Sequence, residues 1–67
     1  MNEEEFFAIL LLLGFEKDTY ISDNVKWQMR LGKLSIYYKW DGFVFVNEKS
    51  AANKTIEETI KYIIERE

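Results

Sequence analysis

Strict alternation of apolar and polar residues is the clearest pattern in the chain, and it runs through residues 25–40. Period two is the spacing of a strand with one buried face. Gly32-Lys33 interrupts the alternation as a two-residue turn of type II′ or I′ would, and Asp41-Gly42 is among the strongest hairpin signals. The pattern therefore predicts three antiparallel strands within residues 25–47.

Two-residue turns at these positions also predict how the strands pair. The expected cross-strand partners are Trp27 with Tyr38, Val25 with Trp40, Trp40 with Phe43, Tyr38 with Phe45, and Ile36 with Asn47. Cross-strand partners share a face, so one face of the sheet is expected to be apolar and to hold both tryptophans. A slip of one residue in either hairpin would move side chains to the opposite face.

An uninterrupted apolar run predicts a first helix over residues 3–13. Asn2 is a good N-cap with Glu5 three positions later, and the three consecutive glutamates at 3–5 suit the positive end of the helix dipole. Gly14 follows the last leucine and suits the left-handed C′ position, after which Phe15 is expected to pack back on the last turn.

A second helix is predicted at the end of the chain. Thr55 and Glu58 match a capping box, and an apolar stripe follows at helical spacing. The stripe consists of Ile56, Ile60, Ile63 and Ile64. An earlier start near Ser50 is also compatible with the pattern, and residues 47–54 are otherwise expected to form a polar loop.

The order of these elements predicts an α+β domain. Its expected architecture is α-β-β-β-α: a three-stranded antiparallel meander with two helices packed on one face, in a single domain over residues 1–67. Residues 16–24 form a polar connection, in which Tyr20 and Ile21 either enter the core or make a short fourth strand. The pattern does not decide between these two alternatives.

This order resembles that of the double-stranded-RNA-binding domain in topology. The motifs of that family are not found here. The Gly32-Lys33 turn is much shorter than the loop that joins the first two strands in that family, and residues 49–54 resemble its lysine cluster only weakly. The resemblance therefore implies a fold analogy and transfers no function.

The net charge of −3 is distributed unevenly along the chain. Residues 1–24 carry −5, residues 25–46 carry +3, and residues 47–67 carry −1. The open face of the sheet is thus expected to be basic, and it is a candidate surface for a protein partner or a nucleic acid. A solvated face of ordinary composition is the alternative. The candidate residues are Lys26, Gln28, Arg30, Lys33, Tyr37, Lys39, Val44 and Val46.

The first helix is apolar on every side from Phe6 to Leu13. A helix of this kind is normally buried all round, yet a two-layer domain covers one side only. The expectation is self-association or docking of a partner, and the alternative is that helix two and the 16–24 connection wrap it. The candidate residues are Phe6, Phe7, Ile9, Leu10, Leu12 and Leu13.

Composition argues against catalysis and against a cofactor. The chain has no Cys and no His, which removes disulfides, thiolate nucleophiles and the commonest metal ligand and general base. Glu16, Asp18 and Asp23 lack the spacing of a calcium loop. No catalytic, cofactor or metal residue is therefore predicted.

The ten-residue apolar run is too short to span a membrane, and three glutamates replace the basic start of a signal peptide. The sequence thus predicts a cytoplasmic protein, in the host cytoplasm if it is viral, with no membrane partner. The expected function is that of a non-enzymatic adaptor or inhibitor, of the kind that phages and mobile elements encode, which binds a protein partner and forms a homo-oligomer. Nucleic-acid binding is the alternative.

Overall fold

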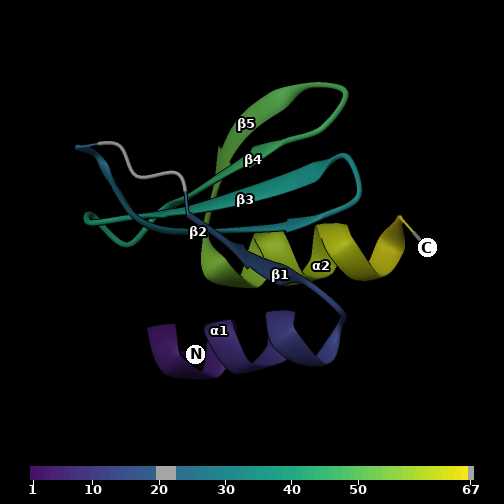
Figure 1. Cartoon of the computed structure of the whole chain (residues 1–67), viewed down its shortest axis with the longest axis horizontal. Helices are drawn as coiled ribbons and strands as arrows, with labels where there is room; N and C mark the ends of the chain where they lie inside the picture. Colours follow the sequence, from purple (N-terminus) through teal and green to yellow (C-terminus); the bar gives the residue numbers. More distant parts are fainter. Residues whose placement is uncertain (20–22, 67) are drawn as a thin grey trace.

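The computed structural model describes residues 1–19 and 23–66. They form two helices and a five-stranded antiparallel sheet whose strands are neighbours in chain order (Figure 1). The elements are α1 (Glu3–Leu12), β1 (Glu16–Asp18), β2 (Val25–Leu31), β3 (Leu34–Lys39), β4 (Val44–Asn47), β5 (Ala51–Lys54) and α2 (Ile56–Glu65). The α+β class and the antiparallel meander are confirmed, whereas the predicted number of strands was wrong.

Two edge strands account for the difference. β1 pairs with β2 from the connection that follows α1, and β5 pairs with β4 from a segment that was expected to be a loop or the start of a helix. Most residues of both strands are exposed, so neither strand shows the alternation by which half-buried strands are recognised. Tyr20 and Ile21 lie outside the described residues. With five strands the chain departs from the α-β-β-β-α order that resembled the RNA-binding domain.

The first hairpin has the predicted register next to its turn. Leu31 lies opposite Leu34, and Trp27 lies opposite Tyr38. Gly32 has a φ of 60°, and no described residue other than glycine has a positive φ. A turn with a positive φ at its first central position alone is of type II′, which matches the twist of the flanking strands.

The second hairpin is shifted by one residue from the prediction. Tyr38 lies opposite Val44 instead of Phe45. The amide of Gly42 donates to the Lys39 carbonyl at 3.1 Å, and the Lys39 amide donates to the Phe43 carbonyl at 2.9 Å. With a φ of 89° at Gly42, these bonds define a three-residue loop that ends in a left-handed glycine.

This one-residue difference reverses the faces of β4. Val44 and Val46, which were expected on the open face, lie in the core with 0% and 2% exposure. Phe45 moves to the opposite face, where it is half-buried beside Tyr37. Trp40 was expected in the core and is instead 66% exposed in the loop.

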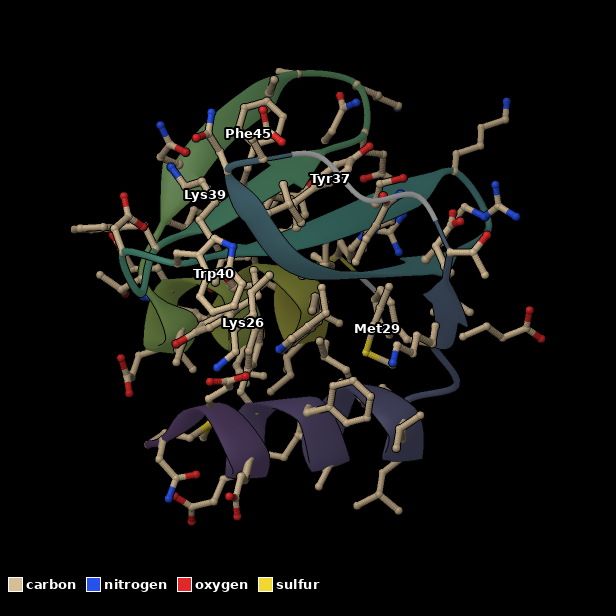
Figure 2. All side chains as sticks on the ribbon, turned by 60° about the vertical axis from the view of Figure 1, so that its left-hand side comes forward. Lys26, Met29, Tyr37, Lys39, Trp40 and Phe45 are labelled. Atoms are coloured by element: carbon tan, nitrogen blue, oxygen red, sulfur yellow. The ribbon has the colours of Figure 1, made fainter. Side chains whose placement is uncertain are left out.

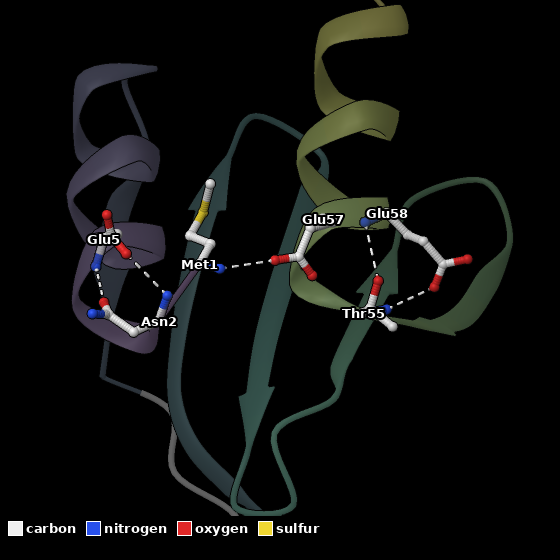
Figure 3. A network of polar contacts seen from close by, with 6 residues as sticks. All are labelled: Met1, Asn2, Glu5, Thr55, Glu57 and Glu58. Atoms are coloured by element: carbon white, nitrogen blue, oxygen red, sulfur yellow. Dashed lines mark hydrogen bonds and ion pairs between the residues drawn. The ribbon is translucent and has the colours of Figure 1, made fainter.

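Both predicted capping boxes are present. The Asn2 side chain accepts from the Glu5 amide at 2.8 Å, and Thr55 Oγ1 accepts from the Glu58 amide at 3.1 Å. Figure 3 shows the two helices side by side, beginning at the same end of the molecule. There the amino group of Met1 lies 3.2 Å from a carboxylate oxygen of Glu57.

The end of α1 forms a Schellman motif. Gly14 has a φ of 98° and donates to the Leu11 carbonyl, while the Phe15 amide donates to the Leu10 carbonyl, both at 3.0 Å. Phe15 is 3% exposed, so it packs back on the helix as predicted.

The core lies between one face of the sheet and the two helices. The aromatic side chains of Phe6, Trp27 and Tyr38 meet in it, with the Trp27 and Tyr38 rings stacked at a centroid distance of 5.1 Å. Its buried apolar residues are Phe6, Leu10, Phe15, Met29, Leu34, Ile36, Val44, Val46, Ile56 and Ile63. Within the described residues, neither helix has the length and apolar character needed to cross a membrane.

Candidate interaction surfaces

The face of the sheet opposite the core, here called the outer face, carries one row of side chains across all five strands. The register places Asp18, Gln28, Tyr37, Phe45 and Asn53 in that row. The Tyr37 and Phe45 rings are 5.8 Å apart at their centroids, and Figure 2 shows both on the side away from the helices. The outer face is therefore centred on an aromatic pair.

Lys26 does not belong to the outer face. The β2–β3 register shifts between Val25 and Trp27, and this irregularity turns Lys26 toward the first helix. Its Nζ lies 2.7 Å from Oε1 of Glu3 and 5.2 Å from the centroid of the Trp40 ring (Figure 2). The predicted pairing of Val25 with Trp40 was wrong for the same reason, because Val25 lies opposite Lys39.

The other predicted bases of this surface are dispersed. Arg30 is exposed beside Glu16 of the neighbouring strand, and Lys33 is exposed in the β2–β3 turn. Lys39 is half-buried and donates to Asn53 Oδ1 at 2.9 Å.

Edge strand β1 removes the basic character that the sequence indicated for this face. The register puts Glu16 opposite Arg30 and Asp18 opposite Gln28, which adds two carboxylates to the outer face. They offset the positive charges of Arg30 and Lys39. The electrostatic argument for a nucleic-acid surface is correspondingly weaker than the sum over residues 25–46 suggested.

Gln28 lies on the outer face but is only 5% exposed. Its Nε2 donates to Asp18 Oδ2 at 3.3 Å, and its Oε1 has no hydrogen-bond partner among the described residues. A side chain this buried offers little surface to an incoming macromolecule, so Gln28 is not an accessible contact residue.

The structure separates the six candidate residues of the first helix into three groups. Phe6 and Leu10 are fully buried in the core of the monomer. Phe7, Ile9 and Leu13 are half-buried. Leu12 is 87% exposed, and Leu11, which was not among the candidates, is 50% exposed. Helical spacing within an all-apolar run gives no means of telling these groups apart.

Two contacts show how the helices are oriented. Met1, just before α1, contacts Glu57 of α2, and helical spacing puts Ile60 and Ile64 on the same side of α2 as Glu57. Phe7 of α1 packs edge-on against Trp27 of β2 at 5.0 Å, so the side of α1 that carries Phe7 faces the sheet.

Helical spacing places Ile9 and Leu12 on the side of α1 opposite Phe7. Ile9 and Ile60 are half-buried, whereas Leu12 and Ile64 are 87% and 59% exposed. We call these apolar residues of the helix layer the helix-layer strip: Met1, Ile9, Leu12, Ile60 and Ile64. Three of them, Met1, Leu12 and Ile64, are exposed in the described part of the chain.

Glu48 anchors the end of β4 to the last turn of α2. Its carboxylate accepts from the Tyr62 hydroxyl at 2.8 Å and from the guanidinium of Arg66. The hydrogen bond from Tyr62, followed by that from Arg66, lowers the pKa of Glu48, and the same carboxylate raises the pKa of Tyr62. The negative charge of Glu48 is thus compensated within the chain.

The described residues contain no cluster of three metal-ligating side chains. An open hollow of about 410 Å³ lies beside the exposed Trp40, lined by Asp23, Asn24, Lys39, Trp40 and Asp41. This lining holds no pairing of a nucleophile with a base.

Comparison with known proteins adds no assignment: no protein-family model matches the sequence, and neither curated proteins nor solved structures gave a match.

Proposed function

We propose that this chain is a small non-enzymatic binding protein that acts through protein–protein contact and self-associates through the helix-layer strip. An adaptor or inhibitor role is the form of this function that suits so small a domain. The observation that carries the proposal is the exposure of two large apolar side chains of the helices, Leu12 at 87% and Ile64 at 59%.

The size of the domain supports association. Domains below about 70–80 residues usually need disulfides, a metal or a second subunit to offset chain entropy. Disulfides are impossible without cysteine. A typical stable interface takes about 800 Å² from each partner, which is a modest share of the 4659 Å² of accessible surface here.

Static light scattering tests self-association. The wild-type protein is expected to show twice the 8.1 kDa mass of one chain. Leu12→Glu should halve that mass, because a carboxylate would then lie in the apolar contact. Phe43→Glu is the matched control, since Phe43 is also exposed, at 49%, but lies in the β3–β4 loop. A wild-type monomer at millimolar concentration would refute self-association.

Nucleic-acid binding is the second candidate function. Its remaining support is the exposure of Arg30 and Lys33 near the β2–β3 turn. Fluorescence anisotropy with labelled single- and double-stranded oligonucleotides at low salt is the test, with Arg30→Glu as the variant. Binding that is absent at low salt would remove this candidate, because phosphate contacts are strongest there.

A further inference from the structure

The two edges of the sheet differ in how they are protected. β1 has only three residues, all of them charged, and short charged edges are a common defence against pairing with another chain. β5 has four residues, Ala-Ala-Asn-Lys, with neither proline nor acidic side chains. In the described part of the chain, β5 pairs with β4 alone (Figure 1). Its outer edge is therefore open to another strand.

The hydrogen bonds of the β4–β5 turn show which backbone groups point outward. The Glu48 amide donates to the Ser50 carbonyl at 3.3 Å, so these two residues form a hydrogen-bonded pair. Such pairs alternate along an antiparallel ladder, so Ala52 and Lys54 direct their backbone groups toward β4. Ala51 and Asn53 then direct their N–H and C=O groups to the open edge.

The side chains of β5 leave this edge accessible. Ala51, Ala52 and Asn53 are exposed, and two of them are alanines, which offer little steric hindrance. Lys54 is the charged residue of the strand, but its Nζ lies over the Tyr62 ring at 5.3 Å, toward α2. Asn53 is held by Lys39 on the outer face. No side chain of β5 is placed to block an incoming strand.

Lysines flank β5, with carboxylates near them. Lys49 precedes the strand and is exposed, Lys54 ends it, and Lys39 reaches its outer face at Asn53. The nearby carboxylates are engaged within the chain. Glu48 accepts from Tyr62 and Arg66, Glu58 accepts from the Thr55 amide at 2.9 Å, and Asp41 lies 4.0 Å from Lys39. An acidic segment complements this edge better than a basic or neutral one.

We propose that β5 binds an extended acidic segment of a partner protein, which adds to the sheet as a sixth strand. Main-chain hydrogen bonds to Ala51 and Asn53 supply affinity, and Lys49, exposed just before the strand, selects acidic side chains. The inference rests on the protein-binding role proposed above and gives its partner a chemical class. It uses a different surface from the helix-layer strip, so the two proposals can fail separately.

Selection from a displayed library of random heptapeptides tests the proposal, with the Leu12→Glu protein as bait so that self-association does not interfere. Selected peptides are expected to be rich in Asp, Glu and β-branched residues. Synthetic copies of the selected peptides should slow hydrogen exchange at the Ala51 and Asn53 amides, which point outward, more than at the Ala52 and Lys54 amides. Affinity should fall as salt is raised.

Ala51→Pro is the decisive variant, because it removes an outward N–H and leaves the bonds to β4 in place. It should weaken peptide binding about tenfold or more, whereas Ala51→Ser, the matched control, should bind as well as the unaltered protein. Lys49→Glu is a second variant that does not touch the strand backbone, and it should also weaken binding.

Three results would overturn the proposal. One is a failure of the library to yield any binder. Another is undiminished binding to both Ala51→Pro and Lys49→Glu. The third concerns the wild-type protein without peptide. If its Ala51 and Asn53 amides are protected from hydrogen exchange, and this protection grows with protein concentration, a second copy occupies the edge.

Discussion

Nε1 of Trp27 donates a hydrogen bond of 2.9 Å to Oε2 of Glu3, which joins the middle of the sheet to the first turn of α1. The other carboxylate oxygen accepts from Lys26 at 2.7 Å. One side chain of the helix thus binds two consecutive residues of β2 at the point where the strand is irregular. These hydrogen bonds, that from Lys26 first, lower the pKa of Glu3.

Removing this link should destabilise the protein. Glu3→Ala leaves the half-buried indole N–H without its acceptor, and we expect the free energy of unfolding to fall by about 1 kcal/mol. Glu3→Gln should cost less, because its amide oxygen still accepts from Trp27. Urea denaturation measures both. Glu4→Ala is the control, since it removes a charge from the same turn, and an equal effect of the two alanine variants would contradict the role of Glu3.

Acid should destabilise the fold. Hydrogen bonds lower the pKa values of Glu3, Glu48, Glu57 and Glu58 below the ordinary 4.5. A carboxyl group with a lowered folded-state pKa contributes stability above its unfolded pKa and loses it as pH falls through the folded pKa. The Tm followed by circular dichroism should therefore fall between pH 5 and pH 3, taking about 4.5 as the unfolded value.

The charge-neutral variant Glu48→Gln should make this fall shallower, because it removes one of the four titrating groups. A Tm that stays constant or rises on acidification over the same range would show that these carboxylates do not favour the folded state.

The register of the second hairpin makes opposite predictions for two adjacent residues. Val46 is 2% exposed in the core, while Phe45 is half-buried on the outer face. Val46→Asn buries an amide without partners and should abolish the cooperative unfolding transition. Phe45→Asn should retain that transition. The two-residue turn that the sequence favours would require the reverse result, so thermal unfolding of the pair distinguishes the registers.

Gly42 tests the three-residue loop itself. Its φ of 89° lies in the region that residues with a side chain rarely adopt, and a Cβ there would have no heavy atom within 4 Å. Backbone strain alone should therefore determine the cost, about 1–2 kcal/mol for Gly42→Ala. Gly42→Asn should cost less, because asparagine tolerates this conformation better. Equal stability of all three proteins would contradict the loop geometry.

Local signals were reliable where a few neighbouring residues supply the whole interaction. The capping boxes of Asn2 and Thr55, the left-handed Gly14 and the turn at Gly32 each depend on contacts within about five residues, and all four are present. Sequence reasoning identified them because the chemistry that stabilises them is complete in the local segment.

The candidate surfaces were less predictable, since they depend on strands that carry no hydrophobic signal. The acids of β1 changed the charge of the outer face, and the irregular step at Lys26 removed a base from it. The β5 edge was missed altogether, because an exposed strand of Ala, Asn and Lys resembles a polar loop. The exposed Leu12 was among the predicted residues, but nothing in the run distinguished it from the buried Leu10.

The sequence by itself determined the α+β class, both helices with their caps, and the first hairpin. Only the tertiary structure decided the faces of β4 and of α1. Residues 43–46 are apolar at every position, so both registers offer an apolar face to the core. The loop conformation determines which register forms. In this loop the Asp41 side chain accepts from the Phe43 amide at 2.9 Å, and Gly42 takes the left-handed conformation. The same ambiguity holds for α1, whose buried side is set by the aromatic residues of the sheet against which it packs.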